Sequence, residues 1–257
     1  MRVIDAMKRD WDERARKNAF HYIASWRTDW DARAFFESGE EDYRRLVKPI
    51  LTEMNFEPRD KCMVEIGCGA GRMTRVFARE FAHVDAIDIS DEMQRRAKEY
   101  LQDFPNIRWI LADGATLSGV TAESADFVFS YLVIQHLPSH AIANTLLREI
   151  LRALKPGGVF LLQFNSARRP TMNWKGRTAW GMVNALWSAG LQRAARMAAS
   201  ALALDPEMVG KSWHGIAIES ADIRRILESA GAKSLRLTGE ATPMAWCSGV
   251  CGVRVDS

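Results

Sequence analysis

The sequence predicts an α/β fold in which a doubly wound, mostly parallel sheet carries helices on both faces. Two observations predict it. Short β-rich runs alternate with runs of helical spacing between residues 61 and 165, and a glycine-rich segment joins the first strand to the helix that follows it. Strands that alternate with helices form βαβ units, and these units build parallel sheets.

Five segments of this region read as strands because they are short, apolar and rich in β-branched and aromatic residues. They are residues 62–66, 83–88, 107–111, 126–132 and 158–164. Three segments between them have the apolar spacing of amphipathic helices, at residues 72–81, 92–101 and 141–154. The LKPGG segment at residues 154–158 ends the last of these helices, since proline and glycine do not continue a helix.

The chain divides into four parts of different character. Residues 1–60 read as an N-terminal helical cap, residues 61–165 as a Rossmann-like core, and residues 216–257 as a helix and a strand pair that complete the core. Residues 166–215 interrupt this pattern with four tryptophans and with seven basic against two acidic residues. Because ligands of open α/β sheets bind beyond the carboxyl ends of the strands, we expect this insertion to form a helical lid there.

The composition is that of a water-soluble globular protein, with 47% hydrophobic and 26% charged residues. A net charge of +3 is too small to indicate nucleic-acid binding by itself. The N-terminal segment is charged and amphipathic, unlike a signal peptide, and the sequence has no apolar run of membrane-spanning length. The four cysteines lack paired metal-binding spacing, so we expect free thiols, a cytoplasmic location and no metal.

The glycine loop Val64–Gly71 (VEIGCGAG) is the strongest functional signal. It follows a strand and opens a helix, where glycines permit a tight turn and the close approach of a ligand. Its spacing differs from the G-x-G-x-x-G of dinucleotide sites. The acid just before the turn, Glu65, would repel a pyrophosphate but suits an ammonium group, and Asp88 at the end of the next strand suits two ribose hydroxyls. These features favour S-adenosylmethionine over a nicotinamide dinucleotide.

Four features in register carry a resemblance to a known family. They are Glu65 with its glycines, Asp88, the Asp113-Gly114 pair after the third strand, and the LKPGG turn. On these features the chain resembles the class I S-adenosylmethionine-dependent methyltransferases of the small-molecule type. The resemblance covers residues 43–165 and, in layout, residues 219–255. It implies a seven-stranded sheet whose last strand is antiparallel.

The same resemblance implies which residues hold the methionine end of the cofactor. Glu65 and Gly67 are expected to hold this end, and Gly69 to lie under the ligand. Tyr131, at the end of the fourth strand, is expected to face it.

For the nucleoside end, the resemblance implies that Asp88 binds the ribose hydroxyls. Ile89 and Met93 would flank the adenine, although core packing explains these two apolar residues equally well. Asp113 would meet the adenine amino group, with Gly114 beside it.

The sequence indicates fewer residues for binding the methyl acceptor than for binding the cofactor. His136 follows the fourth strand and His214 precedes the last helix, and both are candidates for a general base, since histidine titrates near neutral pH. A structural role explains either histidine as well, and methyl transfer from a sulfonium does not require a base. Gln135, Trp174 and Trp213 are candidate substrate-binding residues.

Aromatic residues also mark the N-terminal cap. Trp11, Tyr22, Trp26 and Trp30 either close over the cofactor or pack in the core, and the sequence leaves both readings open.

The predicted reaction is methyl transfer to oxygen, nitrogen or carbon of a small molecule. The tryptophans and basic residues of the lid suit an aromatic or lipidic acceptor with an anionic group. No Asn/Asp-Pro-Pro-Tyr or Pro-Cys motif follows the fourth strand, which argues against methylation of nucleic-acid bases by those devices. The alternatives are an RNA or protein methyltransferase, or a cofactor-binding protein without transfer activity. Membrane-surface contact is less favoured, and monomer and homodimer both remain open.

Overall fold

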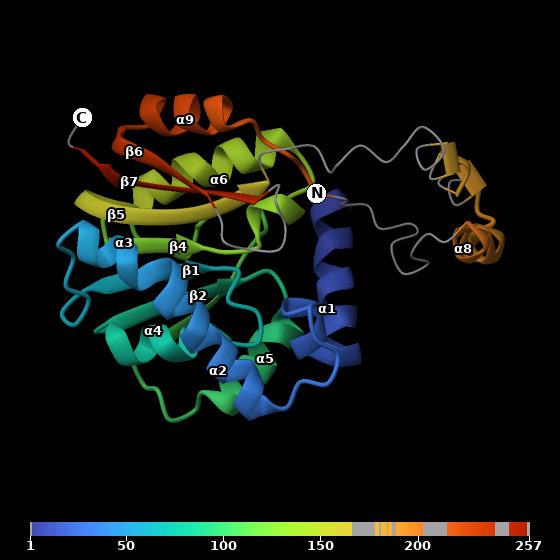
Figure 1. The fold of residues 1–257 in the computed structure, drawn as a ribbon, viewed down its shortest axis with the longest axis horizontal. Coiled ribbons are helices and arrows are strands. Elements are labelled where there is room, and N and C mark those ends of the chain that lie inside the picture. The colour runs from blue at the N-terminus through green and yellow to red at the C-terminus, as the bar shows by residue number, and fades with distance from the viewer. Residues whose placement is uncertain are drawn as a thin grey trace.

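The computed structural model describes residues 2–165, 178–179, 181–183, 185–186, 189–202, 215–239 and 247–255. A seven-stranded sheet in the order β3-β2-β1-β4-β5-β7-β6 forms its centre (Figure 1). Its strands are β1 Cys62–Ile66, β2 His83–Asp88, β3 Ile107–Leu111, β4 Ala125–Ser130, β5 Leu154–Asn165, β6 Ala232–Gly239 and β7 Cys247–Arg254.

Strand pairing confirms the predicted doubly wound sheet. Strands β1 to β5 pair in parallel, whereas β7 runs antiparallel to both of its neighbours, β5 and β6. The last strand in the chain is therefore the reversed one, as the family resemblance implies. Strand order changes direction between β1 and β4, and ligands of open sheets bind at such a switch point.

The first three strands lie where the sequence predicts them, but β4 ends two residues early. It stops at Ser130 because Leu132 adopts φ +59°, in the left-handed region that ends an extended strand. The Leu132 backbone N–H donates instead to the side chain of Gln163 (2.8 Å) on the neighbouring strand. This turn redirects the chain at the mouth of the sheet.

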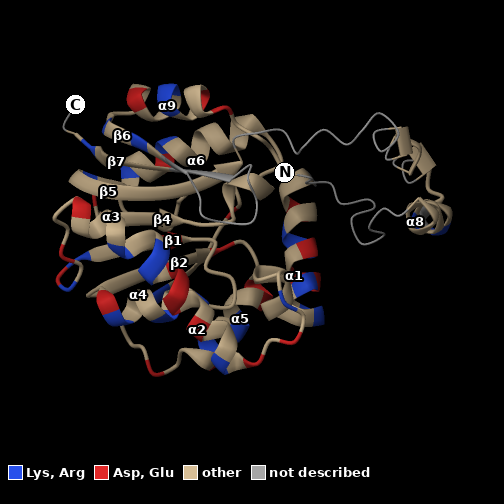
Figure 2. Cartoon of the chain, in the orientation of Figure 1, with Lys and Arg blue, Asp and Glu red and all other residues tan. Residues whose placement is uncertain are grey.

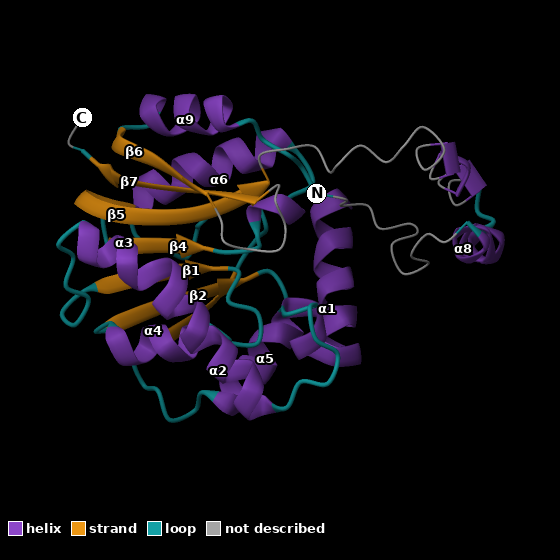
Figure 3. Ribbon diagram, viewed as in Figure 1, coloured by secondary structure: helices purple, strands orange, loops and turns teal. Residues whose placement is uncertain are grey.

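Helices cover both faces of the sheet (Figure 3). They are α1 Arg2–Ile23, α2 Ala32–Asp42, a π-helical turn Tyr43–Val47, α3 Lys48–Glu53, α4 Thr74–Glu80, α5 Asp91–Tyr100, a 3-10 turn Ile134–His136, α6 His140–Ala153, α8 Gln192–Ala201 and α9 Ser220–Ser229. Helices α5 and α6 begin at serine N-caps, Ser90 and Ser139, which accept backbone N–H groups at 3.1 and 3.3 Å. Helices α4, α5 and α6 lie where the sequence predicts them to within about two residues.

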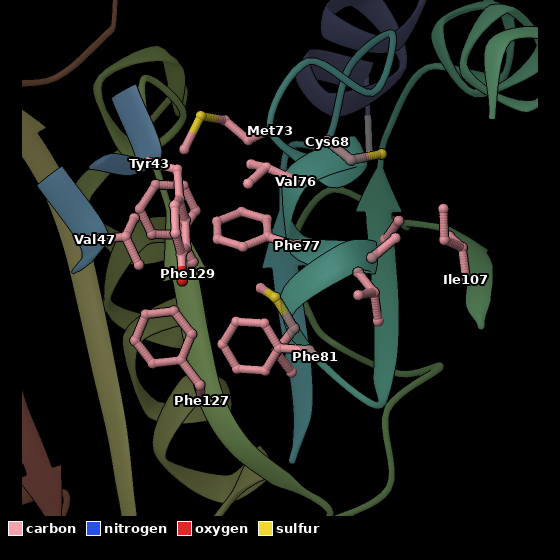
Figure 4. Packing of buried hydrophobic residues seen from close by; sticks show 14 of the residues in the cluster. Tyr43, Val47, Cys68, Met73, Val76, Phe77, Phe81, Ile107, Phe127 and Phe129 are labelled. Carbon is pink, nitrogen blue, oxygen red and sulfur yellow. The ribbon is translucent and has the colours of Figure 1, made fainter. Parts of the chain in front are cut away.

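Two apolar clusters hold these layers together, one on each face of the sheet. On the face covered by α2, α4 and α5, Phe77 of α4 packs edge-on against Phe129 of β4, with ring centroids 5.0 Å apart (Figure 4). Phe81 stacks on Phe127 at 5.7 Å. On the other face, the apolar sides of α6 and α9 pack against β4 and β5. Burial on both faces explains why these strands are almost continuously apolar.

The insertion between β5 and α9 is described only in part. In Figure 1, α8 lies apart from the sheet, and its Ala195 and Ala199 pack against Val183. Trp174 and the Trp213-His214 pair lie outside the described residues. The lid remains a prediction.

Candidate active site

A pocket of about 540 Å³ opens at the carboxyl ends of β1, β2 and β4, where the strand order changes direction. The glycine loop forms its floor, and α1 and the turn after β4 line its walls. None of the described residues of the insertion lines it. The pocket therefore lies where an open α/β sheet binds its ligand.

The backbone of the glycine loop adopts positive φ angles and close contacts that residues with a side chain would not allow. Gly67, Gly69 and Gly71 have φ values of +76°, +54° and +85°. A Cβ on Gly67 would lie 2.1 Å from Val133 Cγ2. The loop also turns tightly enough for the N–H groups of Gly67 and Cys68 to donate to the Ile87 carbonyl at 2.7 and 2.9 Å. These glycines build a bare cradle beside the pocket.

Glu65 lies buried at the end of β1 and lines the pocket. The Thr74 hydroxyl donates to its Oε2 at 2.6 Å. Burial raises the pKa of Glu65 to about 8, although the Thr74 hydrogen bond and the positive charge of Arg72 act in the opposite direction. A buried carboxyl of this kind ionises readily only when a cation arrives, so the site suits an ammonium group.

Asp88 at the end of β2 ties the glycine loop to the next helix. Its Oδ2 accepts the Gly69 N–H and its Oδ1 accepts the Ser90 N–H, both at 2.8 Å. Burial raises the pKa of Asp88 to about 6, against the effect of these backbone hydrogen bonds. The carboxyl lines the pocket, in the position predicted for the residue that binds a ribose.

The residues predicted for the adenine end divide into two groups. Ile89, Met93 and Gly114 line the pocket. Met93 also packs in the apolar core, so it occupies both of the positions predicted for it, at the pocket and in the core. Asp113 does not line the pocket. Its Oδ1 accepts the N–H groups of Ala115 and Thr116 at 2.8 and 2.7 Å, which ties the carboxylate into a turn.

The turn after β4 brings Tyr131, Gln135 and His136 to the pocket. The Gln163 side chain donates to Gln135 Oε1 at 3.1 Å, and Gln135 Nε2 lies 3.2 Å from His136 Nε2. The ring of His136 meets the ring of Trp11 edge-on at 5.4 Å. The candidate base thus faces the N-terminal helix.

Helix α1 supplies a wall of the pocket that the sequence predicts only in part. Trp11 and Tyr22 of α1, and Trp26 just after it, line the pocket, and Trp11 and Trp30 pack against the core. Arg14 lies between two of these rings, with Cζ 4.9 Å from the Trp11 centroid and 5.3 Å from that of Tyr22. Sequence reasoning missed Arg14, although its i, i+3 spacing from Trp11 places both residues on one helix face.

Polar contacts fasten α1 beside the cofactor side of the pocket. The Ser90 hydroxyl donates to Asp12 Oδ1 at 2.7 Å, and the Glu92 N–H donates to the same oxygen at 3.3 Å. The Lys8 ammonium donates to the Ile89 carbonyl at 3.2 Å. An acid at the N-terminus of α5 also complements the helix dipole. The sheet side and the α1 side of the pocket are therefore joined directly.

The residues present fit S-adenosylmethionine. The glycine cradle admits a closely bound ligand, Glu65 suits its ammonium group, and Asp88 suits its ribose hydroxyls. Within the described ranges, no three His, Cys, Asp or Glu side chains are grouped so that they could hold a metal ion. The helices described there include none long and apolar enough to cross a membrane.

Known proteins that resemble this chain are methyltransferases. Residues 64–162 match the family model described as a methyltransferase domain. Trans-aconitate 2-methyltransferase of Azoarcus sp. (strain BH72) is 33% identical over 136 residues, which are 52% of this chain and 50% of that protein. The enzyme of the same name from Rhodopseudomonas palustris (strain BisB18) is 30% identical over 137 residues, again 52% and 50%. The alignment spans about half the length of these relatives.

Solved structures share the fold. Magnesium protoporphyrin IX methyltransferase from Synechocystis PCC 6803, with bound SAH, superposes with a TM-score of 0.61 at 19% identity, covering 98% of this chain and 99% of that one. A SAM-dependent methyltransferase from Aquifex aeolicus gives 0.53 at 17% identity, covering 88% and 100%. Residues 64–162 thus resemble a methyltransferase domain, and the chain shares the fold of these solved methyltransferase structures.

Proposed function

We propose that the chain transfers the methyl group of S-adenosylmethionine to a small organic acid bound between the glycine loop and α1. The observation that carries the proposal is Arg14, whose guanidinium lines the pocket between the rings of Trp11 and Tyr22. Asp10 Oδ2 lies 2.6 Å from Arg14 Nε and helps to orient the group. A planar, oriented guanidinium is the side chain best suited to a carboxylate.

The curated relatives support this class of acceptor. Their name specifies trans-aconitate, a small organic acid. The alignment has about a third of its residues identical and covers half of each chain. We therefore propose the class of acceptor, small organic acids, rather than trans-aconitate itself.

The charges in the pocket also favour an anionic acceptor. Bound S-adenosylmethionine supplies a methyl group on a positively charged sulfur, from which a nucleophile takes it. Glu65 and Asp88 would hold the ammonium and ribose ends, and Arg14 would hold the acceptor from the α1 side. Trp11 and Tyr22 keep water from the guanidinium, which strengthens its attraction for an anion.

A carboxylate acceptor assigns His136 a positioning role. A carboxylate reaches the site already deprotonated, so no base has to remove a proton from it. His136 then holds the acceptor against Trp11, its edge-on neighbour. With a hydroxyl or amine acceptor, His136 would instead act as the base, and the pH profile of its variants separates the two roles.

An acceptor panel tests the proposal. The purified chain is incubated with S-adenosylmethionine carrying a labelled methyl group and with di- and tricarboxylic acids, including trans-aconitate. The corresponding amides, together with phenols, amines and RNA, serve as comparison acceptors. We expect label in the acids and not in their amides. Label confined to the uncharged acceptors or to RNA would contradict the proposal, as would no transfer by protein that binds S-adenosylhomocysteine.

A further inference from the structure

Arg72 is the first residue after the glycine loop. It lines the pocket, yet its side chain is only 3% exposed. One terminal nitrogen donates to Asp42 Oδ2 at 2.7 Å and to the Ser38 carbonyl at 3.2 Å. The Trp26 ring covers the guanidinium, with its centroid 5.4 Å from Cζ. The arginine is thus held in place from α2 and from the segment that follows α1.

One donor of this guanidinium is unsatisfied. Arg72 Nε is buried and has no hydrogen-bond partner among the described residues. A buried polar donor without a partner costs free energy, so such a group calls for a partner that the protein itself does not supply, such as a water or a bound molecule. Arg72 also lies close enough to Glu65 for its charge to oppose the rise in the pKa of that carboxyl.

A carboxyl and a guanidinium that line the same pocket match an amino acid in its zwitterionic form. Glu65 suits the ammonium group, and the unsatisfied Arg72 Nε suits the carboxylate. The methionine part of S-adenosylmethionine carries both groups on one carbon atom. We infer that Arg72 binds the carboxylate of the cofactor, as the counterpart of Glu65.

The assignment places the two arginines of the pocket in different roles. Arg72 is anchored from α2 beside the glycine loop, whereas Arg14 lies on α1 among aromatic rings. Because Arg72 is assigned to the cofactor and Arg14 to the acceptor, binding of the cofactor carboxylate by Arg72 does not depend on whether the acceptor is an organic acid.

Equilibrium binding by calorimetry tests the inference without any turnover. The two ligands are S-adenosylhomocysteine and its decarboxylated analogue, which keeps the ammonium group and lacks only the carboxylate. We expect the wild-type chain to prefer S-adenosylhomocysteine by about tenfold to a hundredfold, the range for one hydrogen bond to a charged group. Arg72→Gln should abolish that preference, because affinity for the analogue should change less than about threefold while affinity for S-adenosylhomocysteine falls.

A matched control is Arg75→Gln. Arg75 also has a buried Nε without a partner, and it pairs with Glu40 at 3.2 Å, but it does not line the pocket. This variant should keep the full preference for the carboxylate. Arg72→Lys, which keeps a positive charge beside Asp42 but lacks the Nε donor, serves if the glutamine variant fails to fold, and it too should lose the preference.

Three results would overturn the inference. They are equal binding of the two ligands by the wild-type chain, an equal loss for both ligands in a folded Arg72 variant, and unchanged cofactor binding together with a raised KM for an acid acceptor. The last result would assign Arg72 to the acceptor. By contrast, selective loss of S-adenosylhomocysteine binding alongside a negative acid panel would support Arg72 and contradict only the proposed acceptor.

Discussion

Two carboxyl groups at the ends of neighbouring strands, the buried Glu65 and the half-buried Asp88, define the cofactor side of the pocket. Glu65 and Asp88 both have raised pKa values, about 8 and about 6, because burial disfavours their charged forms. Their environments differ, since two backbone N–H groups support Asp88 whereas a single hydroxyl supports Glu65. At neutral pH, Asp88 is therefore mostly charged and Glu65 mostly neutral until a cation binds.

We predict that affinity for S-adenosylhomocysteine increases with pH up to about pH 8. Below that value Glu65 must lose its proton before it can pair with the ammonium group, which costs binding free energy. Calorimetry between about pH 6 and pH 8 should show up to a tenfold gain in affinity per pH unit. Glu65→Gln should bind more weakly at pH 8 and show little of this pH dependence. A wild-type affinity that is flat over this range would contradict the prediction.

Stability of the ligand-free protein should change in the opposite direction. A carboxyl whose pKa is raised by folding stabilises the folded state below its unfolded pKa, about 4.5, and this contribution is lost as the pH rises through about 8. Denaturant unfolding should therefore give a lower free energy of unfolding at pH 8 than at pH 5. Glu65→Gln, which resembles the protonated acid, should reduce that difference, and an unchanged difference would argue against a protonated Glu65.

Arg14 is predicted to determine acceptor affinity. Arg14→Gln should raise KM for an acid acceptor by about tenfold or more, the cost of a lost charge-assisted contact, and leave the dissociation constant of S-adenosylhomocysteine nearly unchanged. The control is Arg16→Gln, because Arg16 is exposed on the same helix and does not line the pocket. Equal effects of the two substitutions would point to the overall charge of α1 rather than to a specific contact.

At the scale of elements, α1 and α2 turn an open sheet edge into a pocket. Helix α1 carries charges of both signs (Figure 2), and two of its charged residues, Lys8 and Asp12, attach it to the start of α5. Helix α2 approaches the glycine loop closely at Gly39, which is buried. A Cβ there would lie 2.1 Å from the Arg72 carbonyl oxygen, a backbone atom with little freedom to move.

We therefore predict that Gly39→Ala destabilises the protein by about 1–3 kcal/mol, the usual cost of overpacking. It should also weaken cofactor binding, because the loop that shifts carries Arg72. Thermal unfolding and calorimetry measure the two effects. Gly181→Ala is a suitable control, since Gly181 is helical and a Cβ there would meet no atom within 4 Å. Equal stability of the Gly39 variant and the wild type would mean that α2 packs less closely than described.

At the scale of the whole molecule, the cofactor site connects parts of the chain that are distant in sequence. Asp12 of α1 bonds to Ser90, and Gln163 of β5 bonds to the turn after β4, which also lines the pocket. A ligand held by α1, by the glycine loop and by the ends of three strands binds only the folded chain. Binding should therefore stabilise the fold as a unit.

S-Adenosylhomocysteine at about one hundred times its dissociation constant should stabilise the fold by about 2.7 kcal/mol, and so raise Tm by roughly 5–10 °C. Asp88→Ala removes the predicted ribose contact, so at the same ligand concentration its Tm should rise by only a fraction of that amount. Differential scanning fluorimetry measures both. An equal rise for the variant would contradict the assignment of Asp88 to the ribose.

The sequence by itself determined the fold class, the core strands and the cofactor. Alternating strands and helices and the loop Val64–Gly71 are local patterns, and the conformations they demand follow from φ preferences and apolar spacing. The position of Glu65 just before the glycines is likewise a local feature, and the charge of its carboxylate favours an ammonium group over a pyrophosphate. For the same reason, Asp88 could be placed at the end of its strand and hence at the pocket.

Only the tertiary structure decided what surrounds the cofactor site. Asp113 is predicted to meet the adenine; in the structure its carboxylate bonds to its own turn, and its contact with the adenine stays a prediction. Arg14 and Arg72 looked like ordinary helix and loop arginines. They became pocket residues because α1 docks on α5 and α2 packs on the glycine loop. Such contacts join residues about 30 to 80 positions apart, and helical periodicity specifies which face is buried but not against what.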